Sequence, residues 1–219
     1  MRIDRPSGTT WHVTEVETKL ARRAGLPGAR VFDLVGQSLQ AAKALGLGAG
    51  DRFALALPAS WMVNSPAVST VLRRWALPPH REACLALIEL LESGPEGWDA
   101  DPGTGEALRL ALASLGNEPY VVEAISKVLA LVVPATVPLM PPLARAFVLG
   151  EASKDAPDAF ERMVQWFAGA VRANEAELAR LASLHREVAL TPAGVLDRVL
   201  WYDSDGVRHF EKDKGAAAP

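Results

Sequence analysis

The stretch that most constrains the fold runs from Asn117 to Pro142, with the sequence NEPYVVEAISKVLALVVPATVPLMPP. Its first half consists mainly of small and apolar residues, interrupted by Glu123, Ser126 and Lys127. A helix that is apolar around most of its circumference has to be covered by other parts of the protein. Proline lacks a backbone N–H and clashes with the preceding helical turn, so the four prolines of the second half end the pattern. We therefore expect a central, buried helix over residues 118–133, with Glu123 and Lys127 paired on its polar strip.

A second helix is predicted immediately before this one, so that the two form a helix-hairpin around residues 106–133. Gly116 can adopt the left-handed conformation that commonly ends a helix. Asn117 can cap the next helix with its side-chain oxygen, and Pro119 suits the first turn because its missing N–H is not needed there. The sequence therefore predicts a tight turn at these residues.

Helical periodicity recurs along the rest of the chain, whereas strict alternation over the length of a strand does not. Residues 51–61 are the most ambiguous, and there a helix is favoured slightly over a strand. A chain of 219 residues is long enough to bury a core without disulfides or metals. We therefore expect an all-α, single compact multi-helix domain over residues 13–210, between a flexible N-terminal segment (1–12) and a flexible tail (211–219).

The longest helix is predicted over residues 156–187. Its apolar residues recur every three or four positions and form a seam, which consists of Phe160, Val164, Phe167, Val171, Leu178 and Leu181. Packing in the core or against a partner explains such a seam better than a cofactor site does. Asn174 and His185 lie in the same seam and should be hydrogen bonded, because burying an unpaired polar group costs free energy.

A helix over residues 30–45 is expected to bury the side that carries its regularly spaced apolar residues, namely Val31, Leu34, Val35, Leu39 and Ala42. The glycine-rich residues 46–50, GLGAG, should end this helix. They lack the glycine order of a nucleotide-binding turn, so we interpret them as a linker.

Charge argues against a polyanion as the default partner. The net charge is -3 and the isoelectric point is near 5.8, whereas proteins that bind phosphates usually carry a basic excess. A nucleic-acid role would therefore need a local basic patch. The candidates for nucleic-acid contacts are Arg73, Arg74 and Arg81.

Neither a secretory signal nor a membrane span is expected. The sequence MRIDRPSGTTWHV at the amino end contains charges, proline and glycine, but no apolar core of a signal peptide. The longest strongly apolar run, Val128 to Val133, is far shorter than the roughly 20 residues that cross a bilayer. These features predict a cytoplasmic protein without a membrane partner.

The cysteine and histidine residues predict no metal site and no cofactor. Cys84 is the only cysteine, which excludes internal disulfides and cysteine-rich zinc sites, and its helical neighbours are apolar, so we expect it in the core. The four histidines show neither an HExxH motif nor paired ligand spacing.

The stretch AISKVLALVVPATVPLMPP resembles a pattern of bacterial relatives of helix-hairpin-helix DNA glycosylases, in which A-T/S-K-h-L is followed by P-x-x-h-P-h-h-D. The matching residues are Ser126, Lys127, Leu129, Pro134, Val137 and Pro138. The resemblance implies a catalytic aspartate at the position of Pro141. Such an aspartate stabilises positive charge on the sugar or helps to activate the nucleophile, and proline can do neither. The stretch, AGDRFALALP and VLDRVLWY are also similar to bacterial helical families without an established activity.

We therefore expect a non-enzymatic helical binding or accessory protein on a degenerate glycosylase-like scaffold, with a protein partner. The alternative is a nucleic-acid-acting enzyme or DNA-binding protein of the helix-hairpin-helix type. In that alternative Lys127, Glu123 and Ser126 form the site. A cleft with convergent polar groups around Lys127 would favour the alternative, whereas a filled core would favour the accessory protein.

Overall fold

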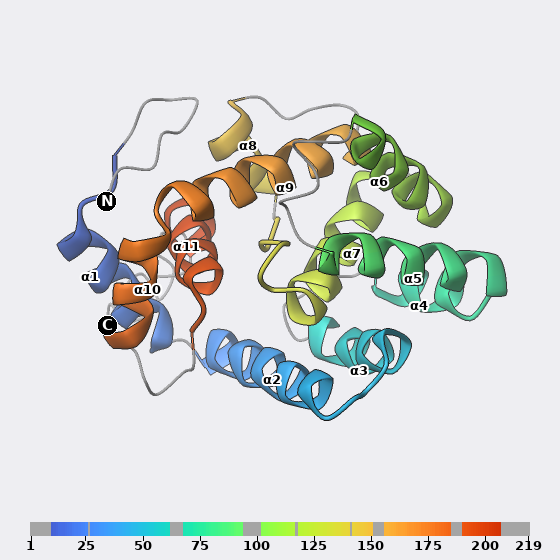
Figure 1. The fold of residues 1–219 in the computed structure, drawn as a ribbon, viewed down its shortest axis with the longest axis horizontal. Helices are drawn as coiled ribbons and strands as arrows, with labels where there is room; N and C mark the ends of the chain where they lie inside the picture. The colour runs from blue at the N-terminus through green and yellow to red at the C-terminus, as the bar shows by residue number, and fades with distance from the viewer. Residues whose placement is uncertain are drawn as a thin grey trace, which may run out of the picture.

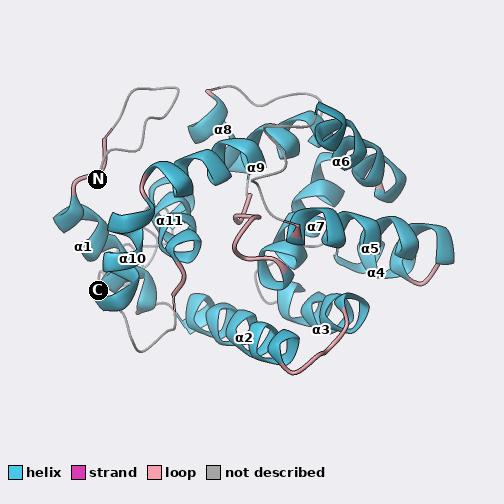
Figure 2. Cartoon of the chain, viewed as in Figure 1, coloured by secondary structure: helices cyan, strands magenta, loops and turns pink. Residues whose placement is uncertain are grey.

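The computed structural model describes residues 10–25, 27–61, 68–93, 102–116, 118–140, 142–150, 156–184 and 190–206. Within these ranges it contains eleven α-helices, one short π-helix and no strand, which confirms the all-α prediction (Figure 2). The helices are α1 (Val13–Ala24), α2 (Pro27–Ala44), α3 (Ala49–Trp61), α4 (Val68–Trp75), α5 (Pro78–Glu92), α6 (Pro102–Leu115), α7 (Pro119–Val132), α8 (Pro142–Leu149), α9 (Ala156–Ala173), α10 (Glu175–Leu184), α11 (Pro192–Trp201) and the π-helix η2 (Tyr202–Gly206).

The helices surround residues 133–140, which continue α7 through the middle of the molecule (Figure 1). These residues form a turn at 133–136 and then run outside any helix, and we call them the extended segment. At one end α1, α10 and α11 lie together, and at the other end α3, α4, α5 and α6 do. Helix α9 spans the distance between the two groups. Most of the extended segment is buried, and the hydroxyl of Thr136 donates to the carbonyl of Leu91 over 3.1 Å.

The predicted central helix is confirmed as α7. All of its residues from Val121 to Val132 are buried except Glu123. Helices α2, α3 and α4 pack against it. Gln40 and Arg52 donate to the last carbonyl of α7, that of Val132, over 3.1 and 3.2 Å. A cation near the last carbonyls of a helix is favourable because that end carries a partial negative charge.

The core consists of two apolar clusters that α9 joins. The larger cluster contains most of the buried residues of α2 to α8, together with Phe160 and Val164 of α9. The smaller cluster is built by α1, α10, α11 and the end of α9, where Phe167 lies. Trp11 belongs to the smaller cluster with 1% of its surface exposed, although we expected residues 1–12 to be flexible.

The prediction of a single helix over residues 156–187 is wrong, because the chain forms two helices that meet at Asn174. The backbone N–H of Asn174 bonds to Val171 three residues back, and its side-chain amide bonds to the carbonyl of Ala170 over 2.9 Å. Asparagine side chains compete with the backbone for such carbonyls, which favours helix ends. The expected hydrogen bonding of Asn174 is confirmed, whereas His185 lies outside the described residues.

The predicted buried side of α2 is confirmed only in part. Leu39 is buried and Val31, Val35 and Ala42 are partly buried, whereas Leu34 is 48% exposed. Phe32 and Asp33 are buried although the apolar spacing did not include them, and Asp33 binds Arg23 and Arg198 there. The ambiguous residues 51–61 are helical, as favoured.

The tight turn between α6 and α7 is confirmed at Gly116, whose φ is +131°, while Asn117 lies outside the described residues. Beyond this turn the two helices of the hairpin diverge. Helix α6 packs mainly against α5 and α9, whereas α7 packs against α2, α3 and α4. The guanidinium of Arg74 lies beside the turn and donates to the carbonyl of Leu115.

Replacing Gly116 by alanine is expected to destabilise the fold by about 1–3 kcal/mol, the usual cost of a strained backbone conformation. An added Cβ would also lie 1.7 Å from Nη1 of Arg74, so that side chain would have to move. Gly169→Ala is the control, since no atom lies within 4 Å of an added Cβ there. Denaturant unfolding should separate the two variants, and equal stabilities would contradict the proposed strain.

Cys84 is buried in the larger cluster, as expected, with 1% of its surface exposed. Burial raises the pKa of its thiol to about 12, so the thiolate that reacts with oxidants or metals hardly forms at neutral pH. No helix in the described part of the chain is long and apolar enough to cross a membrane.

Candidate functional site

The three residues of the predicted site lie together on α7. Nζ of Lys127 is 2.8 Å from Oε1 of Glu123, which is the pairing that their spacing predicted. The hydroxyl of Ser126 is fully buried and donates to the backbone carbonyl of Glu123 over 2.7 Å. The residues are therefore neighbours, but each side chain already has a partner within its own helix.

The surroundings of Lys127 are closed. The residue is 7% exposed, and it does not line a pocket of about 70 Å³ that lies between α2 and α11. Its carboxylate partner is more exposed, since the Glu123 side chain is 23% exposed and that of Lys127 is 9% exposed. A nucleophilic lysine has to reach its substrate, whereas this side chain is paired within a buried helix. Pro141 lies outside the described residues.

The three candidate nucleic-acid contacts have different surroundings. Arg74 is half-buried and binds Glu118 over 3.0 Å, and this hydrogen bond holds the pKa of the Glu118 carboxyl below its usual value. Arg73 and Arg81 are exposed, and neither forms an ion pair with a carboxylate in the described part of the chain. Glu118 precedes Lys127 by nine residues, or about 13 Å along a helix axis. Of the three, Arg74 therefore lies at the start of α7, away from the lysine.

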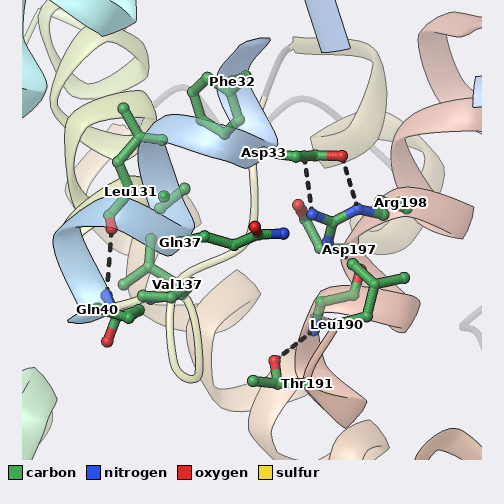
Figure 3. Close-up of a pocket in the computed structure, with 14 residues that line it drawn as sticks. Phe32, Asp33, Gln37, Gln40, Leu131, Val137, Leu190, Thr191, Asp197 and Arg198 are labelled. Carbon is green, nitrogen blue, oxygen red and sulfur yellow. Dashed lines mark hydrogen bonds and ion pairs between the residues drawn. The ribbon is translucent and has the colours of Figure 1, made fainter. Parts of the chain in front are cut away.

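Charged side chains converge at another place, between α1, α2 and α11. The carboxylate of Asp33 binds Arg198 twice, with Oδ1 to Nη2 at 2.7 Å and Oδ2 to Nε at 3.1 Å (Figure 3). Nη1 of Arg23 is 2.7 Å from Oδ2 of the same carboxylate. The exposed fractions of the three side chains are 3% for Arg23, 7% for Asp33 and 14% for Arg198. We call these three residues the buried ion cluster.

Asp197 adds a second carboxylate beside the buried ion cluster. Its Oδ1 accepts a hydrogen bond of 2.7 Å from the backbone N–H of Leu139 in the extended segment. The residue keeps some exposed surface, whereas its carboxyl group is enclosed. Burial raises the pKa of the Asp197 carboxyl above its ordinary 3.8, although the positive charges of Arg198 and Arg23 act in the opposite direction.

A small pocket of about 70 Å³ adjoins the buried ion cluster (Figure 3). Residues of α2, the end of α7, the extended segment and α11 line it. Gln37 extends from α2 into this space with its amide toward Asp197, and its buried Nε2 has no hydrogen-bond partner. A water needs about 10–15 Å³ of such volume, whereas ligand pockets commonly measure roughly 300–1,000 Å³. The pocket therefore has room for a few waters, but not for a sugar or a nucleobase.

Neither the apolar spacing nor a known catalytic motif in the sequence indicates the buried ion cluster. Asp33 and Arg198 lie 165 positions apart, so no local sequence pattern indicates their contact. One signal was present, since the adjacent Asp197 and Arg198 interrupt the otherwise apolar helix in VLDRVLWY. Charged residues on a buried helix are almost never fully buried without a partner.

The described part of the chain contains no metal site. No group of three or more histidine, cysteine, aspartate or glutamate side chains there could hold a metal ion. The carboxylates of the pocket face arginines instead. Asp33 is bound by Arg23 and Arg198, which already supply the positive charge that a cation would bring. The arrangement can hold the helices together and order water, and it offers no open metal site.

Because the pKa of Asp197 is raised, we expect this residue to make the stability of the protein depend on pH. A group whose pKa is higher in the folded state contributes stability below its unfolded value, and this contribution is lost as the pH rises through the folded value. As the pH rises above 3.8, ionisation of the Asp197 carboxyl therefore lowers the stability of the folded protein. Asp197→Asn keeps an oxygen for the N–H of Leu139 and removes the charge. Thermal unfolding of the variant at pH 7 should occur at or above the wild-type temperature.

The comparison should be repeated at acid pH, where the advantage of Asp197→Asn over the wild type is expected to disappear. Using the difference between the two proteins removes the effect of the other carboxylates, which titrate in both. A variant that is less stable than the wild type by the same amount at every pH would contradict the unfavourable charge.

Comparisons with known proteins identify no relative. No family model, no curated protein and no solved structure matches the chain. The functional argument therefore depends on the residues and their geometry.

Proposed function

We propose that the chain is a non-enzymatic helical binding or accessory protein that acts through a protein partner in the cytoplasm. The observation that carries the proposal is the enclosure of Lys127. The only lysine of the glycosylase-like stretch is 7% exposed and paired with Glu123 inside the central helix. A catalytic group has to touch the reacting atoms of its substrate, and this buried side chain does not line the pocket beside the buried ion cluster.

The size and charge of the pocket support the same proposal. About 70 Å³ is too small for a substrate of ordinary size. The charged groups beside it are engaged with one another, since Asp33 binds both Arg23 and Arg198. Such an arrangement stabilises a structure and does not bind a large ligand. The single cysteine suits a reducing compartment, in which disulfides do not persist.

The scaffold is proposed to be a degenerate form of the glycosylase-like arrangement. The two helices of the hairpin and the proline-rich stretch after α7 follow the order of that pattern. Pro141 occupies the position of the catalytic aspartate, and its neighbours Met140 and Pro142 are not ionisable either. Without a carboxylate, the positive charge that develops on the sugar during base release has no counterpart.

A second candidate function, nucleic-acid binding, is favoured by one observation. Arg73 and Arg81 are exposed and form no ion pair among the described residues, so they can contact phosphates. Binding through phosphate contacts releases counterions, and it therefore weakens steeply as the salt concentration rises. This candidate needs no catalysis and is compatible with the enclosed lysine.

Base-excision assays on damaged and mismatched duplexes test the proposal. The wild-type protein is expected to release no base, and Lys127→Ala should not differ from it. Binding of the same duplexes at two salt concentrations tests the second candidate. Robust base release by the wild type, abolished in a folded Lys127→Ala protein, would overturn the non-enzymatic proposal. Arg109→Ala, at an exposed arginine on α6, is the matched control for a general loss of positive charge.

A further inference from the structure

The pocket beside the buried ion cluster presents two hydrogen-bonding groups that no described residue engages. Nε2 of Gln37 is buried without a partner, and Figure 3 shows the amide extending into the pocket toward Asp197. Asp197 lines the same pocket. Its Oδ1 accepts from the backbone N–H of Leu139, while no described residue donates a hydrogen bond to its Oδ2. The pocket therefore offers one donor and one acceptor to a bound molecule.

The other polar side chains of the pocket wall are engaged within the chain. Nε2 of Gln40 donates to two carbonyls at the end of α7, and the hydroxyl oxygen of Thr191 accepts from a backbone N–H of α11. Arg198 is bound in the buried ion cluster and also donates to a backbone carbonyl of α11. A bound molecule would therefore find its polar partners at Gln37 and Asp197.

Much of the remaining wall is apolar and includes Leu131, Val137 and Leu190. A well-ordered water needs about two to four polar partners, and this part of the wall supplies none. Displacing poorly ordered water with an apolar group increases affinity. A molecule that fits the pocket should therefore combine one polar head with a small apolar body.

The size of the pocket limits the molecule further. At roughly 10–15 Å³ for each water, the volume of about 70 Å³ corresponds to about five waters. A ligand of about four non-hydrogen atoms would displace a similar number of waters. The pocket therefore suits a molecule no larger than a simple amide or alcohol.

The charges around the pocket favour a neutral molecule. Asp33, Asp197 and Arg198 line it, and Arg23 is bound to Asp33. An anion would approach two carboxylates, whereas a cation would approach two guanidinium groups. An ion would also lose its hydration on entering, which costs free energy unless an opposite charge is available to pair with it.

We propose that the pocket binds a small neutral molecule whose polar head donates a hydrogen bond to Asp197 and accepts one from Gln37. Simple amides and alcohols have this chemistry. The ligand would connect α2, which packs in the larger cluster, with α11, most of which packs in the smaller one. This site is additional to the proposed protein partner and does not depend on it.

Four probes of nearly the same size separate the contributions to binding in the wild-type protein. Acetamide and isopropanol are neutral and can both donate and accept, acetone can only accept, and acetate is charged. Each probe is titrated at equal ionic strength into the isotope-labelled full chain, and nuclear magnetic resonance follows the backbone N–H of Leu139 and the side-chain amide of Gln37. We expect acetamide and isopropanol to shift both signals saturably, with dissociation constants on the order of 10 mM, because ligands this small bind weakly. Acetone and acetate should bind at least about fivefold more weakly, the usual effect of one lost hydrogen bond.

A substitution tests the donor directly. Gln37→Leu removes the amide and should weaken acetamide binding about fivefold or more, measured at the Leu139 signal. The control is Gln165→Leu on α9, where an exposed glutamine is replaced and binding should not change. The same spectra show whether each variant is folded. If Gln37→Leu does not fold, the comparison of the four probes in the wild-type protein decides the question alone.

Three results would overturn the proposed site. The first is the absence of a saturable shift with acetamide and isopropanol, which would leave the pocket to water. The second is equal affinity for all four probes, and the third is undiminished acetamide binding by a folded Gln37→Leu protein.

Discussion

Replacing Asp33 by alanine is expected to destabilise the protein by about 3–5 kcal/mol, the usual cost of removing one partner from a buried ion pair. The variant removes the carboxylate that binds the guanidinium groups of Arg23 and Arg198. Because folded domains are stable by only about 5–15 kcal/mol, this loss is a large part of the total. Denaturant unfolding followed by circular dichroism measures it.

Two further variants make the Asp33 result specific. Glu89→Ala removes an exposed carboxylate of α5 that forms no ion pair among the described residues, and it should change stability little. A triple variant, Arg23→Met, Asp33→Leu and Arg198→Met, replaces all three charges with apolar side chains and should regain most of the lost stability. If Asp33→Ala were no less stable than Glu89→Ala, the buried ion cluster would not hold the helices together.

Phe167→Ala is expected to destabilise the monomer by about 3–5 kcal/mol, because it removes a fully buried ring from the smaller cluster and leaves a cavity. The seam prediction that named this residue also named Val164, which is fully buried, and Val171, which is partly buried. Thermal or denaturant unfolding measures the loss of stability, and sedimentation measures whether the variant remains a monomer.

Leu184→Ala is the control for Phe167→Ala, since Leu184 is 56% exposed near the end of α10 and should tolerate the change. A Phe167→Ala protein that unfolds like the wild type but associates differently would place the seam in an interface between chains. Unchanged stability together with unchanged association would contradict its burial altogether.

Much of the fold was predictable from local patterns. The apolar residues of α7, the stop before Pro134 and the turn at Gly116 all follow from the properties of neighbouring residues. The pairing of Glu123 with Lys127 was predictable for the same reason, because residues four apart share one face of a helix. The break at Asn174 was not predicted, since apolar spacing continues across it while the asparagine itself ends α9.

The sequence by itself therefore determined the helical class, the central helix and most of the turns, because these depend on interactions between residues close in the chain. The tertiary structure alone decided that Phe32 and Asp33 of α2 are buried while Leu34 is exposed, and which charges meet. Asp33 contacts Arg198 only after α2 and α11 have packed together, and the two residues lie 165 positions apart. The free energy of such a contact depends on burial and on distance in space, and periodicity in the sequence reports neither.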